Sequence, residues 1–310
     1  MLESFRHFCR RHRYLSARRL VQIGILMAFV SGPWWGLWLA RGTLAGSQWL
    51  GLLFLTDPFV FLQSLLAGHS MSAGAISGVI LVAGFYAIFG GRLFCGWVCP
   101  VNLITDAANG LRRGLGWRKA SRLKLDRRLR HVILILALLG AAISGSLLWE
   151  FINPITLSLR GLIFGLWTGA IAAAAGVFLF DFFLLGNGFC GHVCPVGAFY
   201  GWMGKRGKIN VSAEQRQACT NCGDCFKVCP EPHVIAPALR IGGTPNDAGP
   251  TIGHQDCLRC GRCIEVCDQN VFVYRWGQAS IRNTSQGNSS ACQTPWTSAK
   301  ERAHDRKCGN

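Results

Sequence analysis

Two stretches near the C-terminus decide the fold of this chain: Cys219-x2-Cys222-x2-Cys225-x3-Cys229-Pro230 and Cys257-x2-Cys260-x2-Cys263-x3-Cys267. The short gaps let successive thiolates wrap around one metal group while the fourth cysteine reaches across. Paired Cys-x2-Cys motifs also bind zinc. Zinc closes its site with four ligands, however, and gives no reason for three close cysteines plus a fourth in a pattern used twice. The pattern therefore favours iron–sulfur clusters over zinc.

The same spacing is typical of bacterial two-cluster ferredoxins, in which three cysteines of one run and the last cysteine of the other hold each [4Fe–4S] cluster. On this pattern one cluster takes Cys219, Cys222, Cys225 and Cys267. The other cluster takes Cys257, Cys260, Cys263 and Cys229. The second run ends Cys267-Asp268 where the motif has Cys-Pro, a departure that removes no ligand.

The composition indicates a membrane protein. Half of the 310 residues are hydrophobic and only 15% are charged, yet the formal net charge is +17. The basic residues crowd into segments 6–19 and 112–130, beside apolar stretches, which argues for cationic loops and against a nucleic-acid-binding protein. Fifteen cysteines would also suit a secreted disulfide scaffold. Cluster ligands need free thiolates, however, which predicts a reducing compartment.

Crossing a bilayer takes about 20 apolar residues. Four stretches qualify: Leu20–Leu39, Met71–Gly90, Val132–Phe151 and Leu162–Leu185. A fifth, Trp49–Leu66, is interrupted by Asp57-Pro58, which would leave a charge and a broken backbone in lipid. We therefore expect this fifth stretch to be re-entrant or to lie on the outer surface.

The positive-inside rule predicts the topology. The N-terminal arm, the 112–130 loop and the basic segment 205–208 should all be cytoplasmic, which requires an even number of crossings between them. We expect a multi-pass protein of the bacterial inner (cytoplasmic) membrane with both termini in the cytoplasm. Its predicted parts are a basic cytoplasmic arm (1–19), a membrane domain (20–205), a two-cluster ferredoxin domain (206–278) and a disordered polar tail (279–310).

An internal repeat runs through the membrane domain. Cys95-Gly-Trp-Val-Cys99-Pro100 resembles Cys190-Gly-His-Val-Cys194-Pro195, and upstream Asp57-Pro58 matches Asn153-Pro154 at nearly the same offset. Both halves run in the same orientation, so the repeat is parallel. The predicted fold is thus mainly α: a four-helix transmembrane bundle built from a parallel repeat, plus a C-terminal α+β two-[4Fe–4S] ferredoxin domain.

Each Cys-x3-Cys-Pro element presents two thiols together if its turn is helical, because residues i and i+4 share a face. Cys95, Cys99, Cys190 and Cys194 would then form a metal or redox site for an iron–sulfur cluster, zinc or another metal, or a dithiol relay. The alternative is that they are structural thiols packed at Gly-rich turns. The duplication favours the functional interpretation, and the chemistry stays open.

Several further segments carry a resemblance to the NapH family. They are Ser31-Gly32-Pro33-Trp34, Leu55-Thr56-Asp57-Pro58, Leu62-Gln63-Ser64-Leu65, Gly68-His69, Ile104-Thr105-Asp106, Trp149-Glu150, Asn153-Pro154 and Cys229-Pro230-Glu231-Pro232-His233-Val234, with both Cys-x3-Cys-Pro elements. NapH is the membrane ferredoxin subunit of periplasmic nitrate reductase systems. The resemblance implies a quinol dehydrogenase component with two [4Fe–4S] clusters. It also implies a NapG-type periplasmic ferredoxin and a NapC-type multihaem cytochrome as partners.

Related families share this architecture. NosR adds a periplasmic flavin domain and CcoG a C-terminal soluble domain, and this chain contains neither. MauN, from methylamine utilisation, is similar in size and is the harder relative to exclude. It suggests a second function, a ferredoxin-type factor that supplies reducing power for the maturation or assembly of a metalloenzyme.

Quinol oxidation releases two electrons and two protons, so its site needs an apolar slot, a proton acceptor and a nearby one-electron carrier. Histidine is the natural acceptor because its pKa lies closest to neutrality. His69 falls at an outer membrane end, and His192 at an inner end within a Cys-x3-Cys-Pro element. We predict these two as quinol- or proton-binding residues. The plainer interpretation is that each is an interfacial or capping residue.

Overall fold

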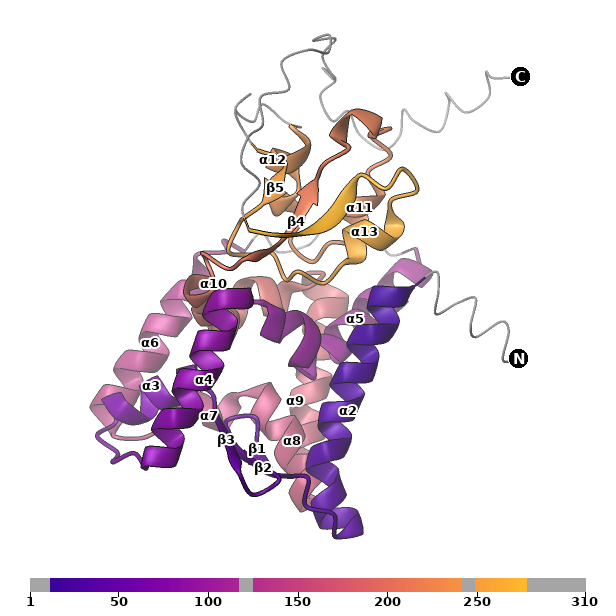
Figure 1. Cartoon of the computed structure of the whole chain (residues 1–310). Helices are drawn as coiled ribbons and strands as arrows, with labels where there is room; N and C mark the ends of the chain where they lie inside the picture. The colour runs from indigo at the N-terminus through magenta and orange to yellow at the C-terminus, as the bar shows by residue number, and fades with distance from the viewer. Residues whose placement is uncertain (1–11, 117–124, 241–248, 278–310) are drawn as a thin grey trace, which may run out of the picture.

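The chain folds into a helical part with a smaller α+β part standing on one end of its helices (Figure 1). This description rests on a computed structural model and covers residues 12–116, 125–240 and 249–277. Most of the predicted N-terminal arm and all of the predicted polar tail (279–310) lie outside these residues. Arg13–Arg19 of the arm are described, and they form the first turns of a long helix rather than a separate segment.

The helical part begins with α2 (Arg13–Trp35), which ends where Gly36 adopts φ 72°. A three-stranded antiparallel meander follows, made of β1 (Ala40–Thr43), β2 (Gly46–Trp49) and β3 (Leu53–Thr56), and then comes α3 (Pro58–Leu66). The stretch Trp49–Leu66 is therefore not a single helix. It contains the last residue of β2, the whole of β3 and a nine-residue helix whose N-cap is Asp57.

The remaining helices of this part follow in chain order. They are α4 (Ala73–Phe89), η1 (Phe94–Val98), α5 (Val101–Gly114), α6 (Leu129–Ser144), α7 (Leu148–Ile152), α8 (Pro154–Phe164), α9 (Trp167–Leu179), η2 (Phe180–Leu184), η3 (Phe189–Val193) and α10 (Pro195–Met203). Of the helices that the structure describes, α2 and the continuous helix from Trp167 to Leu184 are long and apolar enough to cross a membrane.

The other two predicted spans coincide with α4 and α6, apolar helices of 17 and 16 residues. The described helices thus include two of spanning length and two shorter ones, so the predicted four-span bundle is confirmed only in part. Glycines with positive φ end both shorter helices, Gly90 at the end of α4 and Gly145 at the end of α6, and Gly165 likewise separates α8 from α9. The predicted spans Val132–Phe151 and Leu162–Leu185 each included one of these breaks, at Gly145 and Gly165 respectively.

The repeat is visible in local structure. Asp57 and Asn153 are both N-caps followed by proline at N1, and each side chain accepts a backbone N–H of its helix. Asp57 Oδ1 accepts from Phe59 N at 2.7 Å, and Asn153 Oδ1 accepts from Ile155 N at 3.2 Å. In both halves a short helix, a longer apolar helix and a π-helical turn with Cys-x3-Cys-Pro then follow.

The α+β part is built on a three-stranded antiparallel sheet of order β5-β4-β6. Val211 of the central strand pairs with Ile252 on one side and Tyr274 on the other. Its elements are β4 (Ile209–Ala213), η4 (Arg216–Ala218), α11 (Asp224–Val228), η5 (Pro232–Val234), α12 (Ala236–Leu239), β5 (Thr251–Ile252), α13 (Arg262–Val266) and β6 (Phe272–Trp276).

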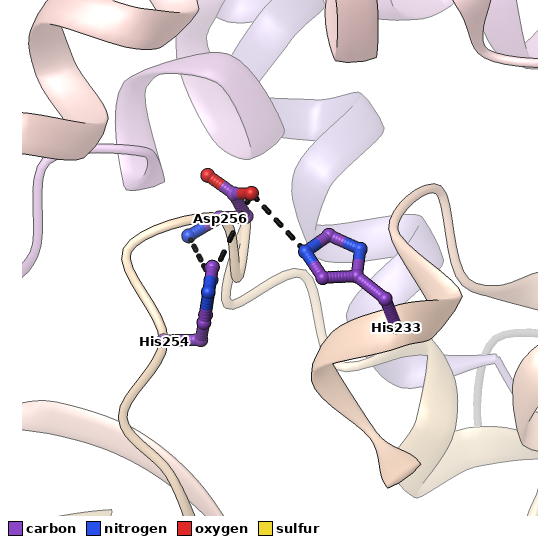
Figure 2. Close-up of side chains that lie close together, drawn as sticks. All are labelled: His233, His254 and Asp256. Atoms are coloured by element: carbon purple, nitrogen blue, oxygen red, sulfur yellow. Dashed lines mark hydrogen bonds and ion pairs between the residues drawn. The ribbon is translucent and has the colours of Figure 1, made fainter. Parts of the chain in front are cut away.

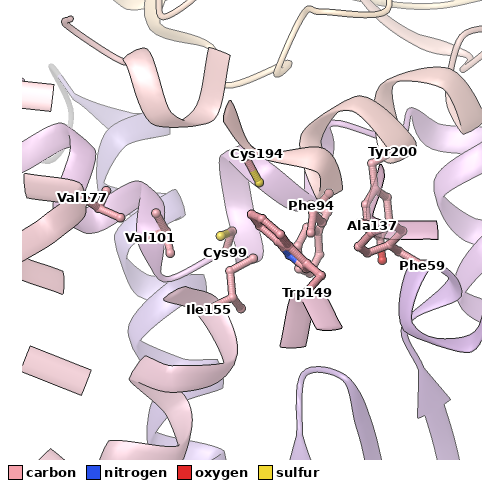
Figure 3. Packing of buried hydrophobic residues seen from close by; sticks show 11 residues of the cluster. Phe59, Phe94, Cys99, Val101, Ala137, Trp149, Ile155, Val177, Cys194 and Tyr200 are labelled. Atoms are coloured by element: carbon pink, nitrogen blue, oxygen red, sulfur yellow. The ribbon is translucent and has the colours of Figure 1, made fainter. Parts of the chain in front are cut away.

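Each part has its own hydrophobic core. In the helical part, Phe59, Phe94, Trp149 and Tyr200 pack around the thiols of the Cys-x3-Cys-Pro elements (Figure 3). Phe94 and Tyr200 stack with ring centroids 4.8 Å apart. In the α+β part, the sheet packs against the helices that carry the cysteine runs.

Close backbone contact in the helical part depends on glycine. A Cβ at Gly91 would lie 1.6 Å from Tyr200 O, whereas a Cβ at Gly84 would meet nothing within 4 Å. We expect Gly91→Ala to destabilise the protein by about 3 kcal/mol or more, since backbone must move to relieve the overlap. Gly84→Ala, the matched control in α4, should be neutral or slightly stabilising. Thermal melting in detergent would measure both, and equal melting temperatures would contradict the packing.

Candidate functional site

The two cysteine runs form matching loops in the α+β part. Each loop passes through left-handed residues, at Asn221 and Gly223 in the first and at Arg259 and Gly261 in the second. Each then enters a short helix, α11 or α13, that begins one residue before the third cysteine of its run. The left-handed residues fold the chain tightly enough for the first three thiols of a run to face one centre.

The thiols group across the two runs as well as within them. Burial first, and then the neighbouring thiols of Cys219, Cys222 and Cys267, raise the pKa of Cys225 to about 11. Burial likewise raises the pKa of Cys229, and the thiols that add to it belong to Cys260 and Cys257 of the other run. The structure therefore brings together the crossed sets that the sequence assigns to two clusters.

The arrangement of the cysteines fits a cluster better than a single ion. A tetrahedral zinc with Zn–S of about 2.3 Å would hold its thiolates about 3.8 Å apart. Among the described residues, the one group arranged like the ligands of a single ion is His233, His254 and Asp256, and it contains no cysteine. A [4Fe–4S] group binds each thiolate to a different iron and so accepts wider spacing. The twelve described cysteines are all free thiols, as such ligands must be.

The Cys-x3-Cys-Pro elements bring a second group of thiols together inside the helical part. Each element is a π-helical turn closed by an N–H of its second cysteine: Cys99 N donates to Phe94 O, and Cys194 N donates to Phe189 O, both at 2.9 Å. Cys99 and Cys194 are buried beside Trp149 and Ile155 (Figure 3). Cys95 and Cys190 pack against the same core, within electrostatic range of both.

The first of these turns touches the second cysteine run directly. A Cβ built on Gly96 would lie 2.9 Å from Leu258 O and 3.7 Å from Cys260 Cβ. The next residue, Trp97, donates its indole N–H to Arg259 O at 3.0 Å. Only glycine lets the turn approach this closely. The backbone of η1, which carries Cys95, therefore lies in direct contact with the loop that carries Cys257 and Cys260.

A buried ion-pair network joins the same elements. Arg92, three residues before Cys95, donates to Glu231 Oε1 at 3.1 Å and to Asp256 O at 2.8 Å. Arg130 of α6 pairs with the Asp256 carboxylate and lies 3.4 Å from Glu231 Oε1. All four side chains are less than 7% exposed. Burial opposes ionisation of Asp256, but His233 and the two arginines hold its pKa well below its usual range.

The arginines of this network also hold the second Cys-x3-Cys-Pro turn. Arg92 donates to Cys190 O at 3.1 Å, and Arg130 donates to Gly191 O at 3.3 Å. Sequence reasoning missed this network, since it counted Arg130 among solvated loop charges. A signal existed, because Glu231 and Asp256 stand beside cluster cysteines while Arg92 interrupts an apolar stretch.

His233, His254 and Asp256 lie together at the edge of the network (Figure 2). Their ligand atoms fall within 4.8 Å, the spacing of a metal site. His233 Nε2 is 3.1 Å from Asp256 Oδ2, but the carboxyl group is already paired with Arg130. His254 Nδ1 accepts the backbone N–H of Asp256 at 3.1 Å and so has no free lone pair for a metal. The trio therefore completes the ion-pair network.

The structure places the two predicted quinol residues far apart in the fold. His69 is exposed in the loop after α3, and in that loop Ala67 O would lie 3.9 Å from a Cβ on Gly145, at the end of α6. This end of α6 lies away from the α+β part (Figure 1). His192 is half-buried in η3, beside Glu231 and Arg127. One quinol head group cannot contact both residues, so they do not form a single site.

Comparison with known families supports the iron–sulfur assignment. A model described as a 4Fe-4S dicluster domain matches residues 210–268. A model described as a 4Fe-4S binding domain matches twice, at 72–118 and 166–212. Each of these two matches contains one Cys-x3-Cys-Pro element, which agrees with the internal repeat. No solved structure matches the chain significantly.

Two groups of curated relatives align with most of the chain. The methylamine utilization ferredoxin-type protein MauN of Methylorubrum extorquens is 51% identical over 76% of this chain and 81% of its own length. MauN of Paracoccus denitrificans is 47% identical, over 76% and 82% respectively. The ferredoxin-type protein NapH of Escherichia coli is also 47% identical, over 74% and 79%.

If the thiols are grouped in crossed sets, cysteine variants from different runs should lose the same cluster. Cys225→Ala and Cys267→Ala should each remove the same cluster, and Cys229→Ala and Cys263→Ala the other, with about four irons lost per chain in every case. Iron analysis and EPR of the dithionite-reduced protein would measure this. If Cys225→Ala and Cys229→Ala abolished the same EPR signal, the crossed assignment would be wrong.

The ion-pair network makes a prediction about docking of the two parts. Asp256→Asn leaves Arg130 buried opposite a neutral amide and should cost about 3–5 kcal/mol. Asp126→Asn is the matched control, because Asp126 pairs with Arg128 at 4.0 Å on the exposed surface, where the cost should stay below about 1 kcal/mol. Thermal melting and limited proteolysis of the 205–208 junction would measure both variants. Equal stability of the two would refute a stabilising network.

Proposed function

Because the chain belongs to the family of NapH- and MauN-type ferredoxin proteins, we propose that it is a quinol dehydrogenase component, which relays electrons from quinol towards a periplasmic nitrate reductase. The two family models that match the chain identify it as a ferredoxin-type 4Fe-4S electron-transfer protein. The observation that carries the proposal is the contact of Gly96 with Leu258 and Cys260, which places the thiols of the helical part beside those of the α+β part.

Two [4Fe–4S] clusters would be held by the crossed sets, Cys219, Cys222, Cys225 and Cys267 in one and Cys257, Cys260, Cys263 and Cys229 in the other. When bound, such clusters supply one-electron transfer at a potential set by their surroundings. The residues around them shape those surroundings: the buried Arg259, which among the described residues donates to Ile209 O, Cys257 O and Asn210 Oδ1 and not to a carboxylate, places positive charge near the second set. Positive charge favours the reduced form of a cluster.

Cys95, Cys99, Cys190 and Cys194 would hold a further redox centre on the route towards the membrane. The match of a 4Fe-4S binding domain model to each half supports this assignment. A π-helical turn is also a rare element that occurs often at functional sites. A centre here would lie between the α+β part and the apolar helices, where electrons bound for the periplasm must pass.

For the topology we propose four spans with both termini and the α+β part in the cytoplasm. The helices α4 and α6 are about 26 and 24 Å long at 1.5 Å per residue, a few ångströms less than the hydrocarbon core of about 30 Å. Local thinning of the bilayer accommodates such a mismatch at modest cost. The side chains exposed on α6, such as Ile135, Leu136 and Ile143, are apolar, as contact with lipid requires.

The proposed partners are a NapG-type periplasmic ferredoxin and a NapC-type multihaem cytochrome. His69 and His192 stay proposals as proton acceptors, His69 for chemistry at the outer end of the helices and His192 beside the buried network. The second candidate function is a MauN-type role in methylamine utilisation, which the 51% identity to that relative favours. Complementation of strains lacking NapH or MauN would separate the two.

The proposal is tested by adding quinol to the purified protein in nanodiscs, with and without its partners, and recording EPR. We expect quinol to reduce at least one iron–sulfur centre. The double variant Cys99→Ala/Cys194→Ala should lose metal and slow the delivery of electrons to the partner by about tenfold or more. Val196→Ala, which opens a gap in the same core without removing a thiol, is the control.

Two results would contradict the proposal. If quinol reduces no centre even with the partners present, the dehydrogenase role is wrong. If the double cysteine variant keeps the metal content and electron delivery of the Val196→Ala control, the four thiols are structural.

A further inference from the structure

A cavity of about 1310 Å³ lies between α2 and α5 of the helical part and α11 and α13 of the α+β part. It is large enough for a ligand with a ring and a chain, since ordinary small-molecule pockets measure about 300–1,000 Å³. Neither His69 nor His192 lines it. The residues that line the cavity, their polarity and their charges indicate which class of ligand it would bind.

One wall is made by the two helices that carry cluster cysteines. Asp224, Val228, Arg262 and Val266 line the cavity, and each directly adjoins a cysteine of the runs in sequence. The cysteines involved belong to both crossed sets: Cys225 and Cys267 to one, Cys229 and Cys263 to the other. A ligand in the cavity would therefore lie one layer of residues from both groups of thiols.

The opposite side of the cavity carries an apolar stretch along α2, a helix long and apolar enough to cross a membrane. Leu15, Leu20 and Ile23 of α2 line the cavity, together with Leu103 of α5. Leu20 is 74% exposed and Ile23 is 52% exposed, although both are large apolar side chains on a helix of spanning length. An apolar chain could enter along this helix directly from the bilayer.

The inner end offers a hydrogen-bond donor that has no acceptor. Arg18 is fully buried and lines the cavity, yet none of its three guanidinium nitrogens has a hydrogen-bond partner among the described residues. The nearest carboxylate oxygen, on Asp106, is 3.8 Å away and already accepts from Arg19, while the other Asp106 oxygen accepts from Arg262. A buried donor without an acceptor is costly, so a ligand oxygen would be stabilising once the guanidinium, which neighbouring atoms now cover, turns towards the cavity.

The charges of the lining favour a neutral ligand over an anionic lipid. Four arginines line the cavity, and four carboxylates balance them: Arg18, Arg19, Arg113 and Arg262 against Asp106, Asp224, Glu265 and Asp268. A phospholipid head group would need a net positive site. A quinol or quinone has an uncharged ring with two oxygens and an apolar tail, which matches the donor, the neutral lining and the apolar wall.

We propose that this cavity is the quinol-binding site, with a ring oxygen on Arg18 and the isoprenoid tail along the apolar face of α2. This rests on the function proposed above. Quinol is oxidised to quinone with loss of two electrons and two protons. The oxidants would be [4Fe–4S] clusters held by the two crossed cysteine sets, one electron going to each, and the two protons would leave to bulk water through the open side, where exposed Asp268 lies.

The binding test uses the full chain in nanodiscs, a photoreactive azidoquinone, and mass spectrometry of the labelled peptides. We expect labelling of α2 or α5 in the ranges 12–24 and 103–113, and loss of that labelling when unlabelled quinone is in excess. Label that is competed away only from the peptide around His192, or from the β1–β3 meander, would overturn the proposal.

Gly24 provides a variant that fills the cavity without harming the fold. It lines the cavity, and a Cβ there would meet nothing within 4 Å. We expect Gly24→Leu to weaken quinone binding about tenfold or more while iron content and melting temperature are kept. Gly84→Leu, at an equally open helix position outside the cavity, should bind quinone as the wild type does.

Arg18→Leu tests the donor. It removes a buried group that has no hydrogen-bond partner, and Asp106 keeps its contacts with Arg19 and Arg262, so the fold should persist. We expect about a tenfold loss of quinone affinity, the value of one charge-assisted hydrogen bond. Arg160→Leu, at an exposed arginine of α8, is the control.

The results separate this site from the function on which it rests. If quinol reduces the clusters equally well in wild type and Gly24→Leu, with unchanged labelling, the cavity is wrong and the dehydrogenase role stands. If labelling here is competed by quinone but quinol reduces no centre, the cavity binds quinone and the dehydrogenase role falls.

Discussion

The structure depends on the buried ion pairs between Arg92, Arg130, Glu231 and Asp256. The two arginines come from the helical part and the two carboxylates from the α+β part, and all four are almost completely removed from solvent. Buried charges of this kind are costly unless each finds a partner in good geometry. The pairing therefore allows the two parts to meet in one arrangement, and separation would leave the charges unpaired.

The arginines of this network also reach the backbone of η3, at Cys190 and Gly191. One set of side chains thus positions a Cys-x3-Cys-Pro turn and the loops before Cys257 and after Cys229. Gly96 and Trp97 make the matching contact from η1. An electron-transfer protein needs its centres held at constant separation, and here charge pairing and a glycine contact hold both groups of thiols together.

A second group of charges, around Asp106, performs a similar task on the other side of the interface. Arg19 of α2 and Arg262 of α13 both donate to Asp106 of α5, and Glu265 accepts the N–H groups of Tyr14 and Leu15 at the start of α2. Between these contacts the interface stays open and forms the large cavity. The interface between the two parts is therefore closely packed around the Arg92–Glu231 network and open at the cavity between α2, α5, α11 and α13.

The sequence by itself determined the parts whose chemistry is local. Cysteine spacing predicted the crossed thiol sets, Asp57-Pro58 and Asn153-Pro154 marked helix starts, and the repeat followed from matching segments. The tertiary structure decided what depends on distant residues: Arg18 and Arg130 lie buried although a basic segment predicts solvated charge, and Gly145 and Gly165 end helices within apolar stretches. A charge is buried or solvated according to the partners that folding brings to it, and those partners lie more than 80 residues away in sequence for Arg18 and more than 100 for Arg130.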